Sequence, residues 1–403
     1  LLARPDNARR SIAARYSPRG DIRARDGSPL ALTVGRPGEY TRLYPLPSAA
    51  PIIGYTHPVF GESGLEAGMD AVLRGLEGYP TATIWEYHLL YGTPPPGLSI
   101  RTALDPALQS LADDLLGDTP GALVLLNAAS GEIYAMASHP GFDPNHLEET
   151  WEDLLEDSRA PLLNRAVQGR YQAGPAAGAL LLGGYLSRKD SLPPLPARPK
   201  YAGLECARPP TAETWSAWLR LGCPAPLAAL GAGIPWGEGI PGGLGKPPKV
   251  RLPYPLGEAE LPSGSEEDYL GLSAAWRVNP LEMALAAAAL SNGGTRPAPR
   301  LVTARQTPEG AWTTLPALGE ARQVFSPQGA REAASLLAVE GAPWWMTVAL
   351  APASETTAYT WVLAGTLPGG EGAPLALALV LEAPRTEQAQ QAAETLLAAA
   401  LGR

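Results

Sequence analysis

The sequence has few of the side chains on which metal centres and disulfide frameworks depend. Its 403 residues include two cysteines, four histidines and four lysines. Two cysteines exclude a disulfide scaffold and a four-cysteine metal site, and none of the histidines stands in an HExxH or CxxC pattern. We therefore expect neither a metal ion nor a cofactor.

The two cysteines, Cys206 and Cys223, leave two interpretations open. Two buried free thiols are the simpler interpretation, because no further cysteine supports a disulfide framework. The alternative is one disulfide that closes a short loop in an oxidising compartment, which would stabilise the fold by about 3 kcal/mol.

Long apolar runs and excess positive charge are also missing. No window reaches the roughly eighteen consecutive apolar residues of a membrane span, and the opening Leu1-Leu2-Ala3-Arg4 is not a complete signal sequence. With 40 acidic and 31 basic residues the net charge is -9, which argues against a nucleic-acid partner. The 45% hydrophobic and 18% charged composition is that of a globular chain, with a length typical of two or three domains.

Residues 1–95 are turn-rich, with short runs typical of β-strands at 40–44 and 81–85 between glycines and prolines. This pattern predicts an extended, non-catalytic N-terminal domain. Its first 25 residues contain seven arginines and two aspartates. They form either a solvated arm or an arm that lies near lipid headgroups or an acidic partner.

Residues 96–403 predict a larger α+β domain, an antiparallel sheet flanked by helices. Asp105-Pro106 is typical of a helix start, and Asn279-Pro280 begins a second helix that ends near Asn292. We expect a hairpin of two buried strands at 122–126 and 133–137. Further expected elements are strands at 359–364 and 375–381, a closing helix, and surface insertions near 190–200 and 239–265.

Many segments, in the right order over nearly the whole chain, are shared with one known family. In the first domain these are Asn7-Ala8-Arg9, Arg19-Gly20-Asp21-Ile22, Arg42-Leu43-Tyr44-Pro45, Gly54-Tyr55 and residues 61–66. In the second they are residues 102–109, 121–125, 130–133, 136–145, 163–166, 279–284 and 291–295. Together they resemble the class B penicillin-binding proteins, the membrane-anchored transpeptidases of bacterial cell-wall synthesis.

The resemblance implies a pedestal, or dimerisation-type, domain at 1–95 and a transpeptidase-like domain at 96–403. It places the chain at the periplasmic face of the bacterial inner membrane, anchored by an N-terminal segment that this sequence does not contain. The expected partner is an integral-membrane peptidoglycan glycosyltransferase or another protein of cell-wall synthesis or division, with the peptidoglycan stem peptide as a possible ligand.

The three motifs that carry the family's chemistry are not found. Where the resemblance places S-x-x-K stand Pro175 and Gly178. Where it places S-x-N stand Gly222 and Pro224, on either side of Cys223. The K-T-G position is occupied by residues 350–354, with Ala351 and Ala353 in place of functional side chains.

The absence of the lysine-containing motifs does not depend on where the resemblance places them. None of the four lysines has a serine three positions before it, and none is followed by Ser-Gly or Thr-Gly. A serine hydroxyl is a weak nucleophile without a nearby base. The sequence therefore predicts no catalytic residue and a pseudoenzyme that acts as a scaffold, with a partly collapsed cleft. The alternatives are an active transpeptidase or carboxypeptidase with a rearranged site, and a module that binds peptidoglycan non-covalently.

Other candidate sites receive simpler interpretations. Cys223 has no histidine near it in sequence, and Gly242–Lys246 lacks the spacing of a phosphate loop. The acidic clusters at 148–157 and 266–268 are typical of solvated faces, and the tryptophan pairs 215/218 and 344/345 of core or interface packing.

Overall fold

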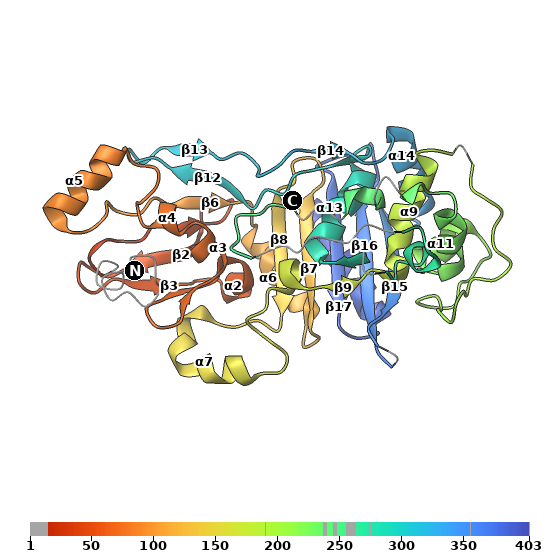
Figure 1. The fold of residues 1–403 in the computed structure, drawn as a ribbon, viewed down its shortest axis with the longest axis horizontal. Helices are drawn as coiled ribbons and strands as arrows, with labels where there is room; N and C mark the ends of the chain where they lie inside the picture. The colour runs from red at the N-terminus through yellow and green to blue at the C-terminus, as the bar shows by residue number, and fades with distance from the viewer. Residues whose placement is uncertain are drawn as a thin grey trace.

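A computed structural model describes residues 15–189, 191–236, 240–244, 248–254, 263–273, 276–354 and 356–402. The molecule is elongated, with a smaller sheet-containing part at one end and a larger one at the other (Figure 1). The predicted α+β class is confirmed. Within these residues, no helix has the length and apolar character that crossing a bilayer requires.

The sheet of the smaller part has six strands in the order β13-β12-β6-β1-β2-β3. These are β1 Ile22–Arg23, β2 Pro29–Val34, β3 Thr41–Leu43, β6 Ile100–Thr102, β12 Val302–Gln306 and β13 Trp312–Thr314. The strand predicted near 40–44 is confirmed as β3. Because β6, β12 and β13 come from residues beyond 96, two later segments of the chain complete this sheet; the boundary near residue 95 stays a prediction.

The short elements around this sheet connect it to the larger part. They are η1 Pro47–Ala49, α2 Ala50–Ile53, β4 Thr56–His57, β5 Gly61–Glu62, α3 Gly64–Gly68, α4 Asp70–Leu73, η2 Pro144–His146 and α7 Leu147–Glu156. The side chain of Asn145, in η2, accepts a hydrogen bond from the Tyr44 amide and donates one to the Tyr44 carbonyl, both at 2.9 Å. Residues 101 apart in sequence are thereby held together.

The strand predicted at 81–85 is wrong. This run begins α5, Thr81–Tyr91, a helix that projects from the end of the molecule (Figure 1). Thr81, Thr83 and Ile84 favour a strand by their β-branched side chains. The helix, however, extends over eleven residues, and Gly92 ends it in the left-handed conformation of a helix C-terminus.

The sheet of the larger part has five antiparallel strands in the order β15-β16-β17-β7-β8. Their bounds are β7 Gly121–Asn127, β8 Ile133–His139, β15 Trp344–Pro352, β16 Ala358–Thr366 and β17 Leu375–Leu381. The predicted hairpin and the strands at 359–364 and 375–381 are confirmed.

Helices cover both faces of this sheet, and the alternation of side chains along its strands divides the core into two layers. One face packs against α6 Pro106–Leu116 and α15 Thr386–Leu401, the other against α13 Pro280–Ser291. The expected helix starts are confirmed: the Asp105 carboxylate accepts from two amides of α6, and Asn279 forms a capping box with Glu282.

The remaining elements lie at the far end and along the helical face of the larger part. They are α8 Arg165–Gln168, β9 Tyr171–Gln172, η3 Gly174–Ala177, α9 Gly178–Leu186, α10 Trp215–Arg220, α11 Pro224–Gly231, η5 Pro241–Gly243, α12 Glu266–Tyr269, β10 Arg277–Val278, β11 Thr295–Arg296, β14 Arg322–Gln323 and α14 Pro327–Leu336.

The two predicted insertions differ. Residues 191–200 form no helix or strand and have no buried side chain, as a surface insertion should. Within the described residues of 239–265, however, Ile240, Leu244 and Leu252 are buried in the core, so that this segment is partly internal. Lys246, part of the weighed phosphate-loop pattern, lies outside the described residues.

Candidate functional site

The segment that the resemblance places at the S-x-x-K position forms the start of a buried helix. Gly174–Ala177 make the single 3-10 turn η3, which runs directly into α9. Pro175 tolerates this position because the first residues of a helix need no amide donor. All residues from Gly174 to Leu186 are buried. Pro175 and Gly178 therefore occupy core positions at a helix start and present no reactive atom.

The segment at the S-x-N position forms a turn that leads into α11. Gly222 has φ 55°, Cys223 is the N-cap residue and Pro224 the first helical residue. Cys223 forms a disulfide with Cys206, so that the interpretation of two free thiols is wrong. The cysteines are 17 positions apart in sequence, but the connecting chain folds back, and the Cα atoms lie 4.1 Å apart. The alternative interpretation, one disulfide that closes a short loop, is confirmed.

The segment at the K-T-G position lies at the end of the edge strand β15. Ala351 is fully buried within the strand, whereas Ala353 follows it in an exposed turn. In that turn the hydroxyl groups of Ser354 and Thr357 are 2.7 Å apart. Ser354 is thus a turn residue with a local partner.

The tertiary structure brings the three motifs together, as their proposed correspondence requires. A Cβ atom built on Gly174 would lie 2.7 Å from the Cβ of Ala351. One built on Gly178 would lie 2.9 Å from Cδ1 of Leu227, in α11. Carbon atoms in van der Waals contact are about 3.5–4.0 Å apart. Residues 174–178 are therefore packed against Ala351 of β15 and Leu227 of α11, and a side chain added at Gly174 or Gly178 would require these neighbours to move.

A loop before β10 closes the same region. The Gly174 amide donates to the carbonyl of Gly271 at 2.9 Å, and the Gln172 side-chain amide donates to that carbonyl at 2.7 Å. Trp361 Nε1, from β16, donates to the Gln172 carbonyl at 2.9 Å. No sequence motif indicated that Gln172 and Gly271 would lie beside Gly174.

The composition of these segments limits their chemistry. Residues 174–178, 222–224 and 350–354 contain no lysine, arginine, histidine, aspartate or glutamate, and Ser354 is their one hydroxyl group. Acyl transfer to a hydroxyl requires a neighbouring base, which these segments do not supply. Within the described part of the chain there is also no cluster of three side chains able to hold a metal ion.

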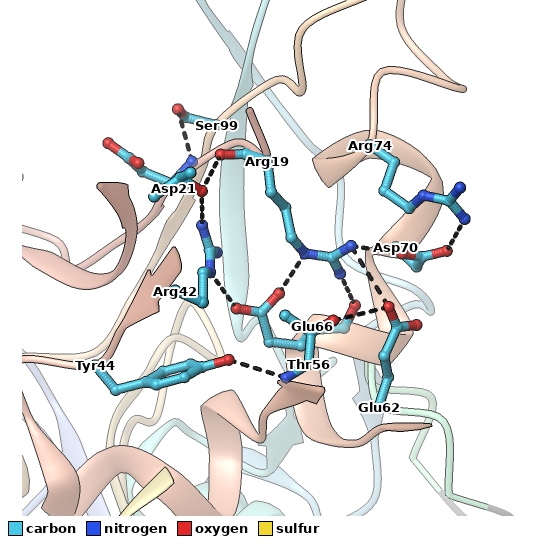
Figure 2. A network of polar contacts seen from close by, with 11 residues as sticks. Arg19, Asp21, Arg42, Tyr44, Thr56, Glu62, Glu66, Asp70, Arg74 and Ser99 are labelled. Atoms are coloured by element: carbon cyan, nitrogen blue, oxygen red, sulfur yellow. Dashed lines mark hydrogen bonds and ion pairs between the residues drawn. The ribbon is translucent and has the colours of Figure 1, made fainter. Parts of the chain in front are cut away.

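The smaller part contains a network of charged side chains of a kind that the three motif positions lack (Figure 2). The buried Glu66 carboxylate lies between two guanidinium groups, 2.6 Å from Nε of Arg19 and 2.7 Å from Nε of Arg42. Arg19 Nη1 also contacts Asp70 at 2.6 Å and Glu62 at 3.6 Å. Arg19, Arg42 and Glu66 belong to the segments that resemble the family, but no sequence pattern assigned a role to them.

Burial and charge act in opposite directions on this network. Burial by itself raises the pKa of the Glu66 carboxyl group, but Arg42 and Arg19 outweigh it and hold the pKa below its ordinary value. Burial lowers the pKa of Arg19, and the carboxylates of Glu66, Asp70 and Glu62 raise it to a value above the ordinary one. Glu66 and Arg19 are therefore charged in the folded protein at neutral pH.

A cavity of about 850 Å³ adjoins the network, between the smaller sheet and the η2–α7 segment. Arg42, Tyr44, His57, Asn145 and Glu148 are among its lining residues. Nη2 of Arg42 is buried without a hydrogen-bond partner. The lining contains arginines and glutamates together, so that it selects no ligand of one charge.

Comparison with known proteins agrees with this architecture. The family described as penicillin binding protein A dimerisation domain matches residues 19–100, and the penicillin binding protein transpeptidase domain family matches residues 121–176. The peptidoglycan D,D-transpeptidase PbpA of Mycolicibacterium smegmatis is 30% identical over 380 residues, covering 84% of this chain and 75% of that protein. PbpA of Mycobacterium tuberculosis is 28% identical over the same coverage.

A solved structure shows the same fold. The imipenem acyl-enzyme complex of penicillin-binding protein A from M. tuberculosis superimposes with a TM-score of 0.82 and 23% identity, covering 97% of this chain and 99% of that one. The architecture is thus that of a penicillin-binding protein. This chain belongs to the class B penicillin-binding proteins, with an N-terminal dimerisation-type module and a transpeptidase-like domain.

Proposed function

We propose that this chain is a catalytically inactive penicillin-binding protein that takes part in bacterial peptidoglycan synthesis as a scaffold or regulator. The observation that carries the proposal is the convergence of three motif positions without a nucleophile or a base. Pro175 has no hydroxyl group, and Gly178 has no amine to activate one. The transpeptidase family match ends at Ala176, one residue after Pro175.

The packing of the region supports the same proposal. Gly178 contacts the Leu227 side chain and Gly174 contacts Ala351 closely enough that added Cβ atoms would overlap them. An acyl-enzyme cleft must admit a peptide and exclude water around a reactive atom. Small apolar residues at the proposed motif positions support the partly collapsed cleft that we expect if the chemistry has been lost.

We propose that the partner is an integral-membrane peptidoglycan glycosyltransferase or another protein of cell-wall synthesis or division, contacted through the N-terminal domain. Of the eleven large apolar residues that are exposed in the described part of the chain, nine lie between residues 16 and 91. Exposed apolar residues gathered in one region are typical of interaction surfaces. The corresponding location is the periplasmic face of the inner membrane, with an N-terminal anchor outside this sequence.

Labelling with a fluorescent penicillin tests the missing chemistry. We expect no covalent label on the purified chain after denaturing electrophoresis, because no residue at the converged motifs can form an acyl-enzyme. PbpA of M. smegmatis, treated in parallel, serves as the positive control. A stoichiometric labelled band that survives boiling would show an active enzyme with a rearranged site, and mapping the labelled peptide would identify its nucleophile.

A pull-down from membranes tests the scaffold role. The chain joined to its native anchor should retain a membrane glycosyltransferase. Reversing Arg9, Arg10 and Arg15 to glutamate should weaken retention, and changes at Pro175 or Ala351 should not. Arg9 and Arg10 lie outside the described residues, so this expectation rests on sequence charge. Retention that depends on Pro175 and Ala351 would place the contact in the larger domain.

A further inference from the structure

Helix α5 leaves large apolar side chains uncovered. Trp85 is 66% exposed, Leu89 79%, Leu90 64% and Tyr91 66%, and no residue of the helix is buried. Single exposed apolar residues are ordinary, but four on one helix of eleven residues are a local concentration of exposed apolar side chains. The helix is therefore a candidate interaction element.

The distribution of these side chains around α5 shows which side faces outward. Thr83, Ile84 and Tyr87 are half-covered, whereas Trp85 and Leu89 lie four positions apart, on one exposed face of the helix. Glu86 is the only acidic side chain, and the helix has no lysine or arginine. An exposed helix surface of this kind is dominated by tryptophan, tyrosine and leucine.

The position of α5 in the molecule indicates what the surface meets. It lies at one end of the long axis, opposite α9, α11 and α14 (Figure 1). The turn between β2 and β3 lies at the same end, and there the Gly38 amide donates to the carbonyl of Arg15 at 2.7 Å. Arg15 belongs to the arginine-rich first 25 residues. The exposed residue Arg15 thus lies at the same end of the molecule as the apolar side chains of α5.

We propose that α5 binds a phospholipid membrane by lying in the boundary between headgroups and acyl chains. Tryptophan and tyrosine are enriched at that boundary because their rings have an apolar body and a polar tip. Eleven residues span about 16 Å, too short for the roughly 30 Å hydrocarbon core, so the helix lies in the surface. The arginine-rich stretch complements anionic headgroups. The proposal rests on the membrane location proposed above and not on the missing chemistry.

Vesicle flotation of the full chain tests the proposal. The vesicles contain phosphatidylglycerol and phosphatidylethanolamine in equal parts, with pure phosphatidylcholine as a comparison. We expect the chain to float with the anionic vesicles and the double variant Trp85→Glu/Leu89→Glu to bind at least about tenfold more weakly, because charged side chains are costly in the interface. The matched control is Leu155→Glu, on α7, where Leu155 is 61% exposed; it should bind as the unmodified chain does.

Quenching by lipids brominated on their acyl chains locates the contact. Tryptophan fluorescence of the unmodified chain should fall on binding, and Trp85→Phe should retain binding but lose most of that quenching. Failure of the unmodified chain to float, or equal binding by the double variant, would overturn the proposal. A dimer that the double variant dissociates, without vesicle binding, would assign α5 to a second copy. A chain that floats but takes the penicillin label would leave this proposal intact and overturn the inactive scaffold.

Discussion

The two domains differ in whether the regions described above bury charged side chains. In the smaller domain, Arg19, Arg42 and Glu66 are buried together in a network of contacts as short as 2.6 Å. In the larger domain, the positions where the family's chemistry needs a hydroxyl group and an amine hold Pro175, Gly178 and their apolar neighbours. The smaller domain buries this charged cluster, whereas residues 174–178, 222–224 and 350–354 of the larger domain contain no charged side chain.

This difference separates two reasons for keeping polar groups. A buried ion pair adds little to stability, because desolvation offsets most of the attraction, and well-packed apolar residues often replace it without loss. In the larger domain, Pro175 and Ala351 are buried among small apolar residues. That the smaller domain keeps its network agrees with our proposal that the function lies there.

The largest effect should come from breaking the charge network. Replacing Glu66 with alanine leaves the Arg19 and Arg42 guanidinium groups buried without their shared carboxylate. We expect the free energy of unfolding to fall by about 3–5 kcal/mol, measured by chemical denaturation.

Glu39→Ala is the matched control, because its carboxylate pairs with Arg36 at the surface, with both side chains well exposed. That change should cost at most about 1 kcal/mol. Equal losses in the two variants would show that the network contributes no more than a surface pair.

A smaller effect should follow from restoring the first motif. In the double variant Pro175→Ser/Gly178→Lys, the new lysine must displace Leu227, because a Cβ at position 178 already lies 2.9 Å from Cδ1. Overpacking of this kind costs about 1–3 kcal/mol, and burial of the amine adds to it.

We also expect no turnover of a stem-peptide mimic by this variant, since the other two motifs remain absent and catalytic groups act as a unit. The control Ala353→Lys, in the exposed turn after β15, should change the free energy of unfolding by no more than about 0.5 kcal/mol. Measurable turnover would refute the loss of chemistry.

The smallest effect should be the acid dependence of the network. The folded-state pKa of Glu66 lies below its ordinary value of 4.5. Its contribution to stability is therefore fully present above that value and is lost as the pH falls through the folded-state pKa. Burial opposes the two arginines, which limits the size of the shift. Unfolding free energies measured from pH 7 downward should decline less steeply below pH 4.5 in Glu66→Gln than in the unmodified chain. An identical decline would assign the acid sensitivity to other carboxyl groups.

Local patterns predicted the elements of the larger domain well. The Asp105 and Asn279 caps and the hairpin at 122–137 depend on residues close together in sequence, and each was located from the sequence. Residues 81–85 were misassigned because β-branched residues in a short window favour a strand, whereas the whole segment up to Gly92 forms a helix. Short windows fail where a longer segment decides.

The sequence by itself determined the absence of the catalytic motifs, since no lysine stands in an S-x-x-K or K-T-G pattern anywhere in the chain. It also determined the order of family segments that led to the fold class. Only the tertiary structure decided that Cys206 reaches Cys223, that Gly174 packs against Ala351, and that Glu66 joins two distant arginines. Each of these contacts joins residues far apart in the chain, and their distances follow from how the helices and sheets pack, which no local pattern specifies.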